Sequence, residues 1–227
     1  MSRTTSTIII ADDHPLFREA LTHAIRNCIA DANIVEADSL DSLQRVVAEN
    51  ERADLLLLDL NMPGVVGFSA LAYIRSTYET LATVIVSATD DPSVIRRAIQ
   101  HGASGFIPKS SSITDIEAAI GDVLQGELWL PPGTVLHDQK LGGAEADVAA
   151  ALSTLTPHQF RVLLILSQGL MNKQIAYQLG VSEATVKAHV TAVLRKLKVS
   201  NRTQAVLALQ KLTLDANNSE QSPVFAT

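Results

Sequence analysis

The sequence contains few of the residues that crosslink a protein or anchor it in a membrane. Cys28 is its only cysteine, so an internal disulfide is impossible. Aromatic residues make up only 4% of the chain, so the core must come from the aliphatic part of a 47% hydrophobic composition. The longest apolar runs, such as "LLLL" at 55–58, are much shorter than the roughly 20 residues of a membrane helix. Because "MSRTTSTIII" also lacks a secretory signal, we expect a cytoplasmic protein.

Charge is distributed unevenly along the 227 residues, whose formal net charge is −6. Residues 1–126 carry 9 Lys and Arg against 17 Asp and Glu, whereas residues 153–227 carry 8 against 3. An acidic first half and a basic second half predict two domains with different partners.

Short apolar runs alternate with helix-length segments through residue 109. The runs are "STIIIAD" at 6–12, "NIVEAD" at 33–38, "DLLLLDL" at 54–60, "TVIVSA" at 83–88 and "GFIPK" at 105–109. This alternation predicts an α/β domain, a flavodoxin-like, doubly wound sheet of five parallel strands. In the first helical segment, Phe17, Leu21, Ile25 and Cys28 share one face, so we expect Cys28 to be a core residue.

Polar residues stand at the ends of four of these strands. Asp12 and Asp13 end the first strand, Asp59 the third, Ser87 the fourth and Lys109 the fifth. Ligands bind beyond the carboxyl ends of such strands, at the switch in strand order, so we expect these side chains to converge. Two carboxylates about 4 Å apart repel by roughly 4 kcal/mol at an effective dielectric near 20. A hard divalent cation such as Mg²⁺ relieves that repulsion.

The chemistry that this set favours is phosphoryl transfer to one carboxylate, with the cation and a lysine neutralising the moving group. Taken singly, each residue has a simpler role, as a helix cap, a turn residue or a solvated charge. The six histidines lack the spacing of a zinc site, and no G-x-x-x-x-G-K-[ST] motif for binding nucleotide phosphates is present.

The C-terminal part carries the start and stop signals of four short helices. Helix starts are expected at Thr156, Asn172, Ser182 and Asn201. The middle pair, joined by "LGVS", is typical of a helix-turn-helix. We therefore expect a small all-α helix-turn-helix domain over residues 153–214.

The segment between the domains, residues 127–152, is predicted to be a linker, with a short helix over 144–152. Trp129 within it either contacts the second domain or packs against the preceding helix. Residues 215–227 are predicted to be a disordered tail.

The third helix of the C-terminal domain has two distinct faces. Val186, Val190, Val193 and Leu197 form an apolar stripe that predicts core packing. A neighbouring stripe is basic and hydroxylic: Lys187, Thr191, Arg195 and Lys198. Residues 184–211 contain no Asp or Glu, whereas an ordinary solvated face mixes both signs. This division favours a recognition helix that enters the major groove of DNA.

The stretches "ADDHPLFREAL", "LLLLDLNMPGVVGF", "IVSAT" and "GASGFIPKS" resemble the receiver domain of two-component response regulators over about residues 6–126, so we expect a receiver domain over residues 1–126. This resemblance implies that Asp59 accepts phosphate from a sensor histidine kinase. It also implies Mg²⁺ ligands, namely Asp12, Asp13, Asp59 and the backbone carbonyl of Asn61. Ser87 and Phe106 are then the switch residues, and Lys109 is the counter-charge of the phosphoryl group.

The stretches "LTPHQFRVL", "GLMNKQIAYQLGVSEATVKAHVTAVLRKLKV" and "NRTQAV" resemble the LuxR-type (NarL/FixJ-like) DNA-binding domain. The resemblance implies that Lys187, Ala188 and Thr191 face base edges. Further residues are implied to contact phosphates: Asn172, Lys173, Thr185, Arg195 and Arg202. The last helix is implied to support pairing of two copies.

Together these features predict a transcription regulator controlled by phosphorylation, and not an enzyme, although the receiver assists its own phosphoryl transfer and dephosphorylation. Its expected partners are a sensor histidine kinase, double-stranded DNA with paired half-sites and, in the active form, a second copy; no membrane is expected. The motifs "LNMPGVVGFSAL", "GFIPKS" and "ELWLPP" further resemble regulators of acetate or alcohol use.

Two alternatives remain open. The first is a hydrolase or phosphotransferase that forms an aspartyl-phosphate, although the second acid of its D-x-D motif is Asn61 here. The second is a DNA-binding protein whose receiver does not switch and serves only for dimerisation.

Overall fold

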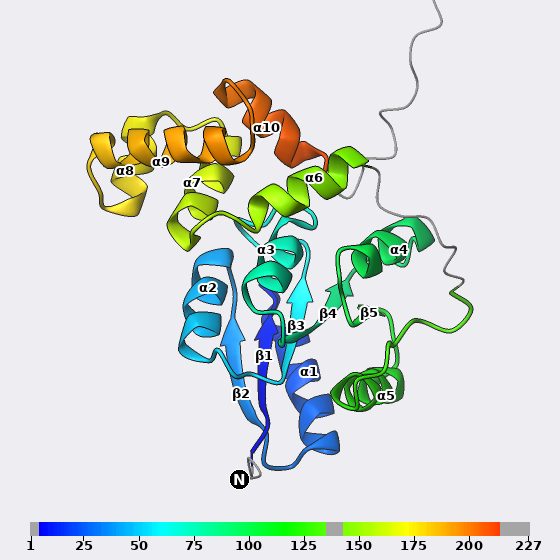
Figure 1. Cartoon of the computed structure of the whole chain (residues 1–227). Coiled ribbons are helices and arrows are strands. Elements are labelled where there is room, and N and C mark those ends of the chain that lie inside the picture. The colour runs from blue at the N-terminus through cyan, green and yellow to red at the C-terminus, as the bar shows by residue number, and fades with distance from the viewer. Residues whose placement is uncertain (1–4, 135–142, 214–227) are drawn as a thin grey trace, which may run out of the picture.

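The computed structural model describes residues 5–134 and 143–213 of the chain (Figure 1). The prediction of a disordered tail over 215–227 lies outside these ranges. Within them, no helix is both long and apolar enough to span a bilayer.

The N-terminal domain is built on a sheet of five parallel strands. They are β1 (Thr7–Ala11), β2 (Asn33–Ala37), β3 (Leu55–Asp59), β4 (Ala82–Ser87) and β5 (Gly105–Pro108). Their spatial order, β2-β1-β3-β4-β5, confirms the predicted doubly wound sheet and places the switch point between β1 and β3. The proline that ends β5 is tolerated because β5 is an edge strand.

Helices cover both faces of the sheet. On one face lie α1 (Pro15–Cys28) and α5 (Ile113–Leu124), and on the other lie α2 (Leu40–Glu49), α3 (Ser69–Thr77) and α4 (Pro92–Gln100). Because side chains alternate along a strand, Ile8 and Ile10 pack towards α1 and α5, whereas Ile9 packs towards the opposite helices. All three isoleucines are fully buried, which explains the unbroken apolar runs in the sequence.

Cys28 does not join this core, so its prediction as a core residue is wrong. The residue is exposed, and its Sγ atom lies 3.6 Å from the carbonyl oxygen of Glu117 on α5. It is the last residue of α1, one turn beyond the fully buried Ile25. The apolar face of α1 therefore extends further than the core that buries it. Partial burial and the charge of Glu117 raise the pKa of the thiol, which disfavours the reactive thiolate.

The C-terminal domain is helical, as predicted. Its helices are α7 (Pro157–Ser167), α8 (Asn172–Leu179), α9 (Glu183–Lys196) and α10 (Arg202–Gln210). The side chains of Thr156, Ser182 and Asn201 each accept a hydrogen bond from the backbone N–H of the third helical residue. Gly180 ends α8 with a φ of 65°, a conformation that glycine adopts without strain.

Parts of the predicted linker pack against the N-terminal domain. Trp129 pairs with Gly105 beside β5 and is only 9% exposed, so it belongs to the core of the N-terminal domain. The predicted short helix is α6 (Gly143–Leu152), which packs against α3 (Figure 1).

One hydrophobic cluster continues from the N-terminal into the C-terminal domain. At its centre the rings of Tyr73 on α3 and Phe160 on α7 stack with centroids 4.4 Å apart and planes 4° from parallel. Both residues are almost fully buried. The two domains are therefore docked in this structure.

Candidate functional site

The predicted convergence of acidic side chains at the carboxyl ends of the strands is present. Ligand atoms of Asp12, Asp13, His14 and Asp59 all lie within 4.8 Å of one another. Asp12 and Asp59 are each only 1% exposed. The Nζ atom of Lys109 lies 2.7 Å from Oδ2 of Asp12 and 2.8 Å from Oδ2 of Asp59. One ammonium group thus bridges two buried carboxylates.

The register of the sheet accounts for this geometry. Parallel pairing sets Ala11 beside Leu58, so Asp12 and Asp59 occupy the next position on each strand. The backbone then fixes each carboxylate, because Oδ1 of Asp12 accepts a hydrogen bond from the N–H of His14 at 2.8 Å. Oδ1 of Asp59 likewise accepts one from the N–H of Asn61 at 3.0 Å.

Lys109 is held in place by both backbone and side-chain contacts. Its N–H donates to the carbonyl of Ser87 at 2.7 Å, and its Nζ lies 5.1 Å from the ring centroid of Phe17. Burial lowers the pKa of Lys109, but its close contacts and charge interactions with Asp12 and Asp59 outweigh that effect and raise it. The amine is therefore a fixed positive charge at neutral pH.

The donor set fits a hard divalent cation. Oδ2 of Asp12 and Oδ1 of Asp13 are shielded from solvent and accept no hydrogen bond from the residues described. Each still lies close to a nitrogen, Lys109 Nζ at 2.7 Å and His14 Nδ1 at 2.8 Å. Because these contacts are short but lack hydrogen-bond geometry, both oxygens keep lone pairs that a cation could bind.

His14 is the one member of this cluster that the sequence analysis missed. Its side chain is 64% exposed, at the mouth of the site. The only signal was its position directly after the two aspartates in "ADDHP".

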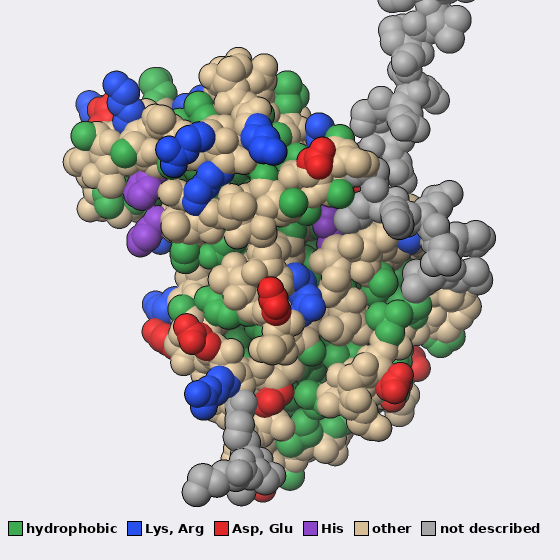
Figure 2. Space-filling view, viewed as in Figure 1, with side chains coloured by type: hydrophobic (Ala, Val, Ile, Leu, Met, Phe, Trp, Pro, Cys, Tyr) green, Lys and Arg blue, Asp and Glu red, His purple; other side chains and the backbone are tan. Residues whose placement is uncertain are grey.

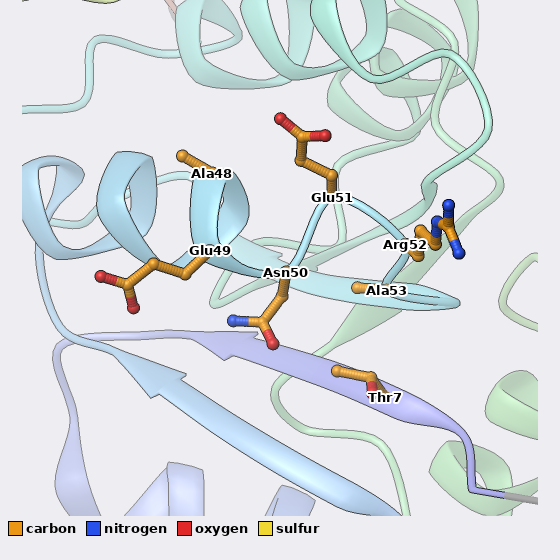
Figure 3. Close-up of a pocket in the computed structure, with 7 residues that line it drawn as sticks. All are labelled: Thr7, Ala48, Glu49, Asn50, Glu51, Arg52 and Ala53. Atoms are coloured by element: carbon orange, nitrogen blue, oxygen red, sulfur yellow. The ribbon is translucent and has the colours of Figure 1, made fainter.

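A hollow of about 380 Å³ opens beside the acidic cluster. Its lining residues come from several elements: His14, Leu16, Phe17, Asp59, Asn61, Ala88 and Lys109. A phosphoryl group could reach Asp59 and Lys109 from this side. A separate hollow, drawn in Figure 3, lies at the opposite, amino end of β1 near Thr7. There the side chains of Glu49, Asn50 and Glu51 point in different directions, so we assign no site to it.

The two residues predicted to switch are both fully buried. Ser87 ends β4, and its Oγ atom accepts a hydrogen bond from the N–H of Thr89 at 3.4 Å. Phe106 on β5 belongs to the same hydrophobic cluster as Val94 and Ile95 of α4.

The recognition face of α9, defined here as Lys187, Ala188, Thr191 and Arg195, is exposed, as predicted. The opposite side of the helix is anchored by Val186 and Val193, both fully buried. Figure 2 shows Lys and Arg side chains gathered over the C-terminal helices on the face in view. The apolar and basic stripes of the sequence thus separate as a recognition helix requires.

The other predicted DNA contacts lie at helix starts, with one qualification. Asn172 and Lys173 begin α8, and Thr185 lies in the first turn of α9, where backbone N–H groups favour phosphates. Arg202 differs, because its Nη2 atom donates to the carbonyl oxygens of Leu166 and Leu170. This arginine ties α10 to the end of α7, which leaves only its other nitrogens for a phosphate.

Comparison with known proteins identifies the family of each domain. Residues 8–121 match the family described as "Response regulator receiver domain", and residues 153–209 match "Bacterial regulatory proteins, luxR family". The protein is thus a two-domain regulator of the receiver type. It belongs to the response regulators of two-component systems, with a LuxR-type DNA-binding domain.

Relatives of similar length share this architecture. The chain is 43% identical over 206 residues to the "Glycerol metabolism activator" of Pseudomonas putida. The aligned region covers 88% of this chain and 93% of that protein. It is 32% identical over 203 residues to the "Nitrate/nitrite response regulator protein NarL" of Escherichia coli K12, covering 89% and 94%. A solved structure of RcsB from Salmonella typhimurium has the same fold, with a TM-score of 0.54 at 22% identity, covering 90% and 98%.

Proposed function

We propose that Asp59 is the phosphoacceptor of this response regulator and that a sensor histidine kinase is the donor. The observation that carries the proposal is the position of Asp59, buried between Lys109 and the acidic pair Asp12 and Asp13, beside an open hollow. In the transfer, an oxygen of Asp59 forms a bond to phosphorus while the P–N bond of the donor phosphohistidine breaks. The donor imidazole leaves with the electron pair of that bond.

The chain's own residues prepare this transfer. Asp12, Asp13, Asp59 and the carbonyl of Asn61 would hold Mg²⁺, which supplies positive charge for the phosphoryl oxygens when bound. Lys109 supplies a second, fixed positive charge 2.8 Å from the accepting carboxylate. The N–H of Asn61 holds Oδ1 of Asp59 and the amine of Lys109 holds Oδ2, so both oxygens of the accepting carboxylate have fixed positions.

The proposed response to phosphorylation begins at Ser87 and Phe106. The Ser87 hydroxyl turns towards the new phosphoryl oxygens, and Phe106 repacks into the space that this movement opens. Because Phe106 shares a hydrophobic cluster with Val94 and Ile95 of α4, its repacking then shifts α4.

The proposed output is sequence-specific binding of promoter DNA in the cytoplasm by two copies of the chain. Lys187, Ala188 and Thr191 face base edges, and the phosphate contacts come from a second set: Asn172, Lys173, Thr185, Arg195 and the free nitrogens of Arg202. Two copies would place two recognition helices on paired half-sites.

The test is DNA affinity at one stated salt concentration, with and without acetyl phosphate and Mg²⁺. We expect the phosphodonor to raise the affinity of the wild type for a duplex with two half-sites and to leave Asp59→Asn unchanged. Equal affinity with and without the donor would favour a receiver that only dimerises. Turnover of phosphomonoesters would favour a hydrolase.

The biological target we propose is a set of genes for the use of an alcohol or polyol. The support is the name of the 43% identical relative, "Glycerol metabolism activator". Deletion of the gene in the source organism should impair growth on such a carbon source and lower transcripts of the matching dehydrogenases. Normal growth on every alcohol tested would contradict this assignment.

A further inference from the structure

Arg18 on α1 links the end of β1 to the neighbouring strand β2. Its Nη1 atom donates a hydrogen bond to the backbone carbonyl of Asp12 at 2.8 Å, and its Nε atom donates to Oε2 of Glu36 at 2.7 Å. The Arg18 side chain is only 17% exposed, whereas that of Glu36 is 48% exposed. A single guanidinium group thus holds a backbone group of the acidic site from outside that site.

The local fold brings these two side chains together. Arg18 is the fourth residue of α1, and its N–H donates to the carbonyl of His14 at 3.1 Å, so the helix begins directly after the acidic pair. Helical side chains lean towards the N-terminus of their helix, which turns Arg18 back to the end of β1. Glu36 pairs in register with Ile10, whose side chain packs towards α1, so Glu36 lies on the same face of the sheet.

The hydrogen bond from Arg18 fixes the peptide plane between Asp12 and Asp13. The carbonyl of Asp12 and the N–H of Asp13 belong to one rigid plane. Within the part of the chain that the structure describes, this N–H donates no hydrogen bond, whereas the carbonyl accepts from Arg18. The preceding peptide is held separately, by the hydrogen bond from the N–H of Asp12 to the carbonyl of Ala37 at 3.0 Å. Arg18 therefore sets the direction in which the backbone enters Asp13.

Asp13 depends on its backbone more than the other two carboxylates of the site do. Asp12 and Asp59 are each 1% exposed, and each has one carboxylate oxygen that accepts from a backbone N–H. The Asp13 side chain is 32% exposed, and it meets Nδ1 of His14, itself 64% exposed, at 2.8 Å. A carboxylate with so little packing around it takes its position mainly from the peptide that carries it.

The charge of Arg18 works against this positioning effect. A positive charge beside a cation site repels the ion, so its removal alone should tighten cation binding. Glu36 reduces that repulsion, because its carboxylate pairs with Nε of Arg18 and offsets the guanidinium charge. The pair thus supplies a backbone hydrogen bond at the site while it adds little net charge there.

We propose that Arg18, held by Glu36, is a positioning residue that keeps the carboxylate of Asp13 turned towards the bound cation. It does so by fixing the peptide plane between Asp12 and Asp13. The inference rests on the proposed function, in which this acidic cluster holds Mg²⁺ for phosphoryl transfer. Residues that support metal ligands in this way typically account for about 10- to 100-fold in metal affinity.

The test measures the Mg²⁺ affinity of the full-length protein by titration of backbone amide signals in NMR spectra. We expect Arg18→Gln to weaken Mg²⁺ binding by about tenfold or more. Arg18→Lys keeps the charge but lacks the planar fork that reaches both partners, so its affinity should lie between those of the wild type and Arg18→Gln. The direction of the change is decisive, because a purely electrostatic role predicts tighter binding in Arg18→Gln and no change in Arg18→Lys.

Phosphorylation by acetyl phosphate gives a second readout. The Mg²⁺ concentration for the half-maximal rate should rise about tenfold in Arg18→Gln, because the variant binds the cation less tightly. The rate at saturating Mg²⁺ should stay within about threefold of the wild type, since the reacting groups are intact. A general disturbance of the fold would lower the saturated rate as well.

A double-mutant cycle tests whether Arg18 acts through Asp13. In an Asp13→Asn background, Arg18→Gln should reduce the Mg²⁺ affinity by less than about threefold, because the ligand that Arg18 positions has already lost its charge. An equal loss of affinity in both backgrounds would mean that Arg18 does not act through Asp13.

Matched variants separate this role from charge and from folding. Arg26→Gln removes the same charge from an exposed position of α1 and should keep the Mg²⁺ affinity of the wild type. Glu36→Gln keeps an acceptor for Nε but leaves the guanidinium charge without its partner, so it should weaken Mg²⁺ binding less than Arg18→Gln. Urea unfolding without Mg²⁺ shows whether each variant folds, and if Arg18→Gln does not, the decrease expected in Arg18→Lys decides the test.

The outcomes separate the inference from the function on which it rests. Unchanged or tighter Mg²⁺ binding in Arg18→Gln would overturn the inference, as would equal losses with and without the carboxylate of Asp13. A wild type that binds Mg²⁺ and accepts phosphate on Asp59 would leave the proposed function intact in either case. Failure of the wild type itself to bind Mg²⁺ or to accept phosphate would instead overturn the proposed function.

Discussion

Lys109 places its ammonium nitrogen 2.8 Å from a carboxylate oxygen of Asp59, fifty residues earlier in the chain. The two residues end strands that are not neighbours, because β4 lies between β3 and β5. Only the shared edge of a parallel sheet brings them together. The contact brings together the carboxylate proposed to accept the phosphoryl group and the ammonium group proposed to neutralise its charge.

Removing Lys109 should destabilise the receiver in the absence of divalent cations. Lys109→Met leaves Asp12 and Asp59 buried without their common counter-charge, and for a partly exposed lysine we expect a loss on the order of 2 kcal/mol. Saturating Mg²⁺ should recover most of that loss. Urea unfolding of wild type and variant, each with and without Mg²⁺, measures both effects.

The pH dependence of that difference follows from the raised pKa of Lys109. A lysine whose pKa is higher in the folded state stabilises the fold below its unfolded pKa, and this contribution disappears as pH rises through the folded value. The gap between wild type and Lys109→Met should therefore be constant from neutral pH to about 10 and shrink above it. If the difference in stability between wild type and Lys109→Met disappeared below pH 9, the pairing of Lys109 with Asp12 and Asp59 would be contradicted.

Asp13 should matter more for cation binding than for folding. Asp13→Asn removes a charged cation ligand, and the internal contact that it weakens is the partly exposed pairing of Oδ1 with Nδ1 of His14 at 2.8 Å. A cation present at about 100 times its Kd stabilises the wild type by about 2.7 kcal/mol. We expect the Mg²⁺-induced shift in Tm to fall at least by half in Asp13→Asn. Asp31→Asn, at an exposed position, is the matched control and should keep the full shift.

The stacked pair of Tyr73 and Phe160 should couple the stabilities of the two domains. A double-mutant cycle with Tyr73→Leu and Phe160→Leu should give an interaction energy of about 0.5–1.5 kcal/mol. Ile25→Val, in the separate cluster on the other face of the sheet, combined with Phe160→Leu is the control and should be additive within about 0.5 kcal/mol. Additivity of the first pair would mean that the domains separate before either unfolds.

The recognition face should distinguish base contacts from phosphate contacts. Lys187→Ala should cost about 1–3 kcal/mol on the preferred sequence and relax discrimination at one base position. Lys173→Ala should weaken all sequences alike and reduce the dependence of log K on log salt by about one unit. Arg26→Ala removes a positive charge from α1 and should leave both quantities unchanged. Equal effects of Lys187→Ala on every sequence would exclude a base contact for that lysine.

Much of this structure could be predicted from the sequence because its signals are local. The helix caps at Thr156, Ser182 and Asn201 depend on hydrogen bonds within four residues, and all three predicted caps are present in the structure. The convergence of Asp12, Asp59 and Lys109 is not local, but alternating strands and helices fix where parallel strands end.

The features that escaped prediction depend on where separate elements meet. The helical spacing of apolar residues in α1 correctly predicted that Ile25 is buried. It failed at Cys28, because the core that buries Ile25 does not reach the end of the helix. Nη2 of Arg97 on α4 donates to Oε1 of Glu145 on α6 at 2.7 Å, but the sequence does not separate these residues from solvated charges, because no periodicity indicates which helix contacts another. Trp129 left two packing partners open, and only the pairing with Gly105 decides between them.

The measurement that tests the account most directly is the site of phosphorylation. The protein is incubated with acetyl phosphate and Mg²⁺, the acyl phosphate is trapped by borohydride reduction, and peptides are mapped by mass spectrometry. We predict one modified residue, Asp59, and no modification when Mg²⁺ is removed or when Asp59 is replaced by Asn. Modification of Asp12 or Asp13 in the wild type, or undiminished labelling of Asp59→Asn, would contradict the central claim.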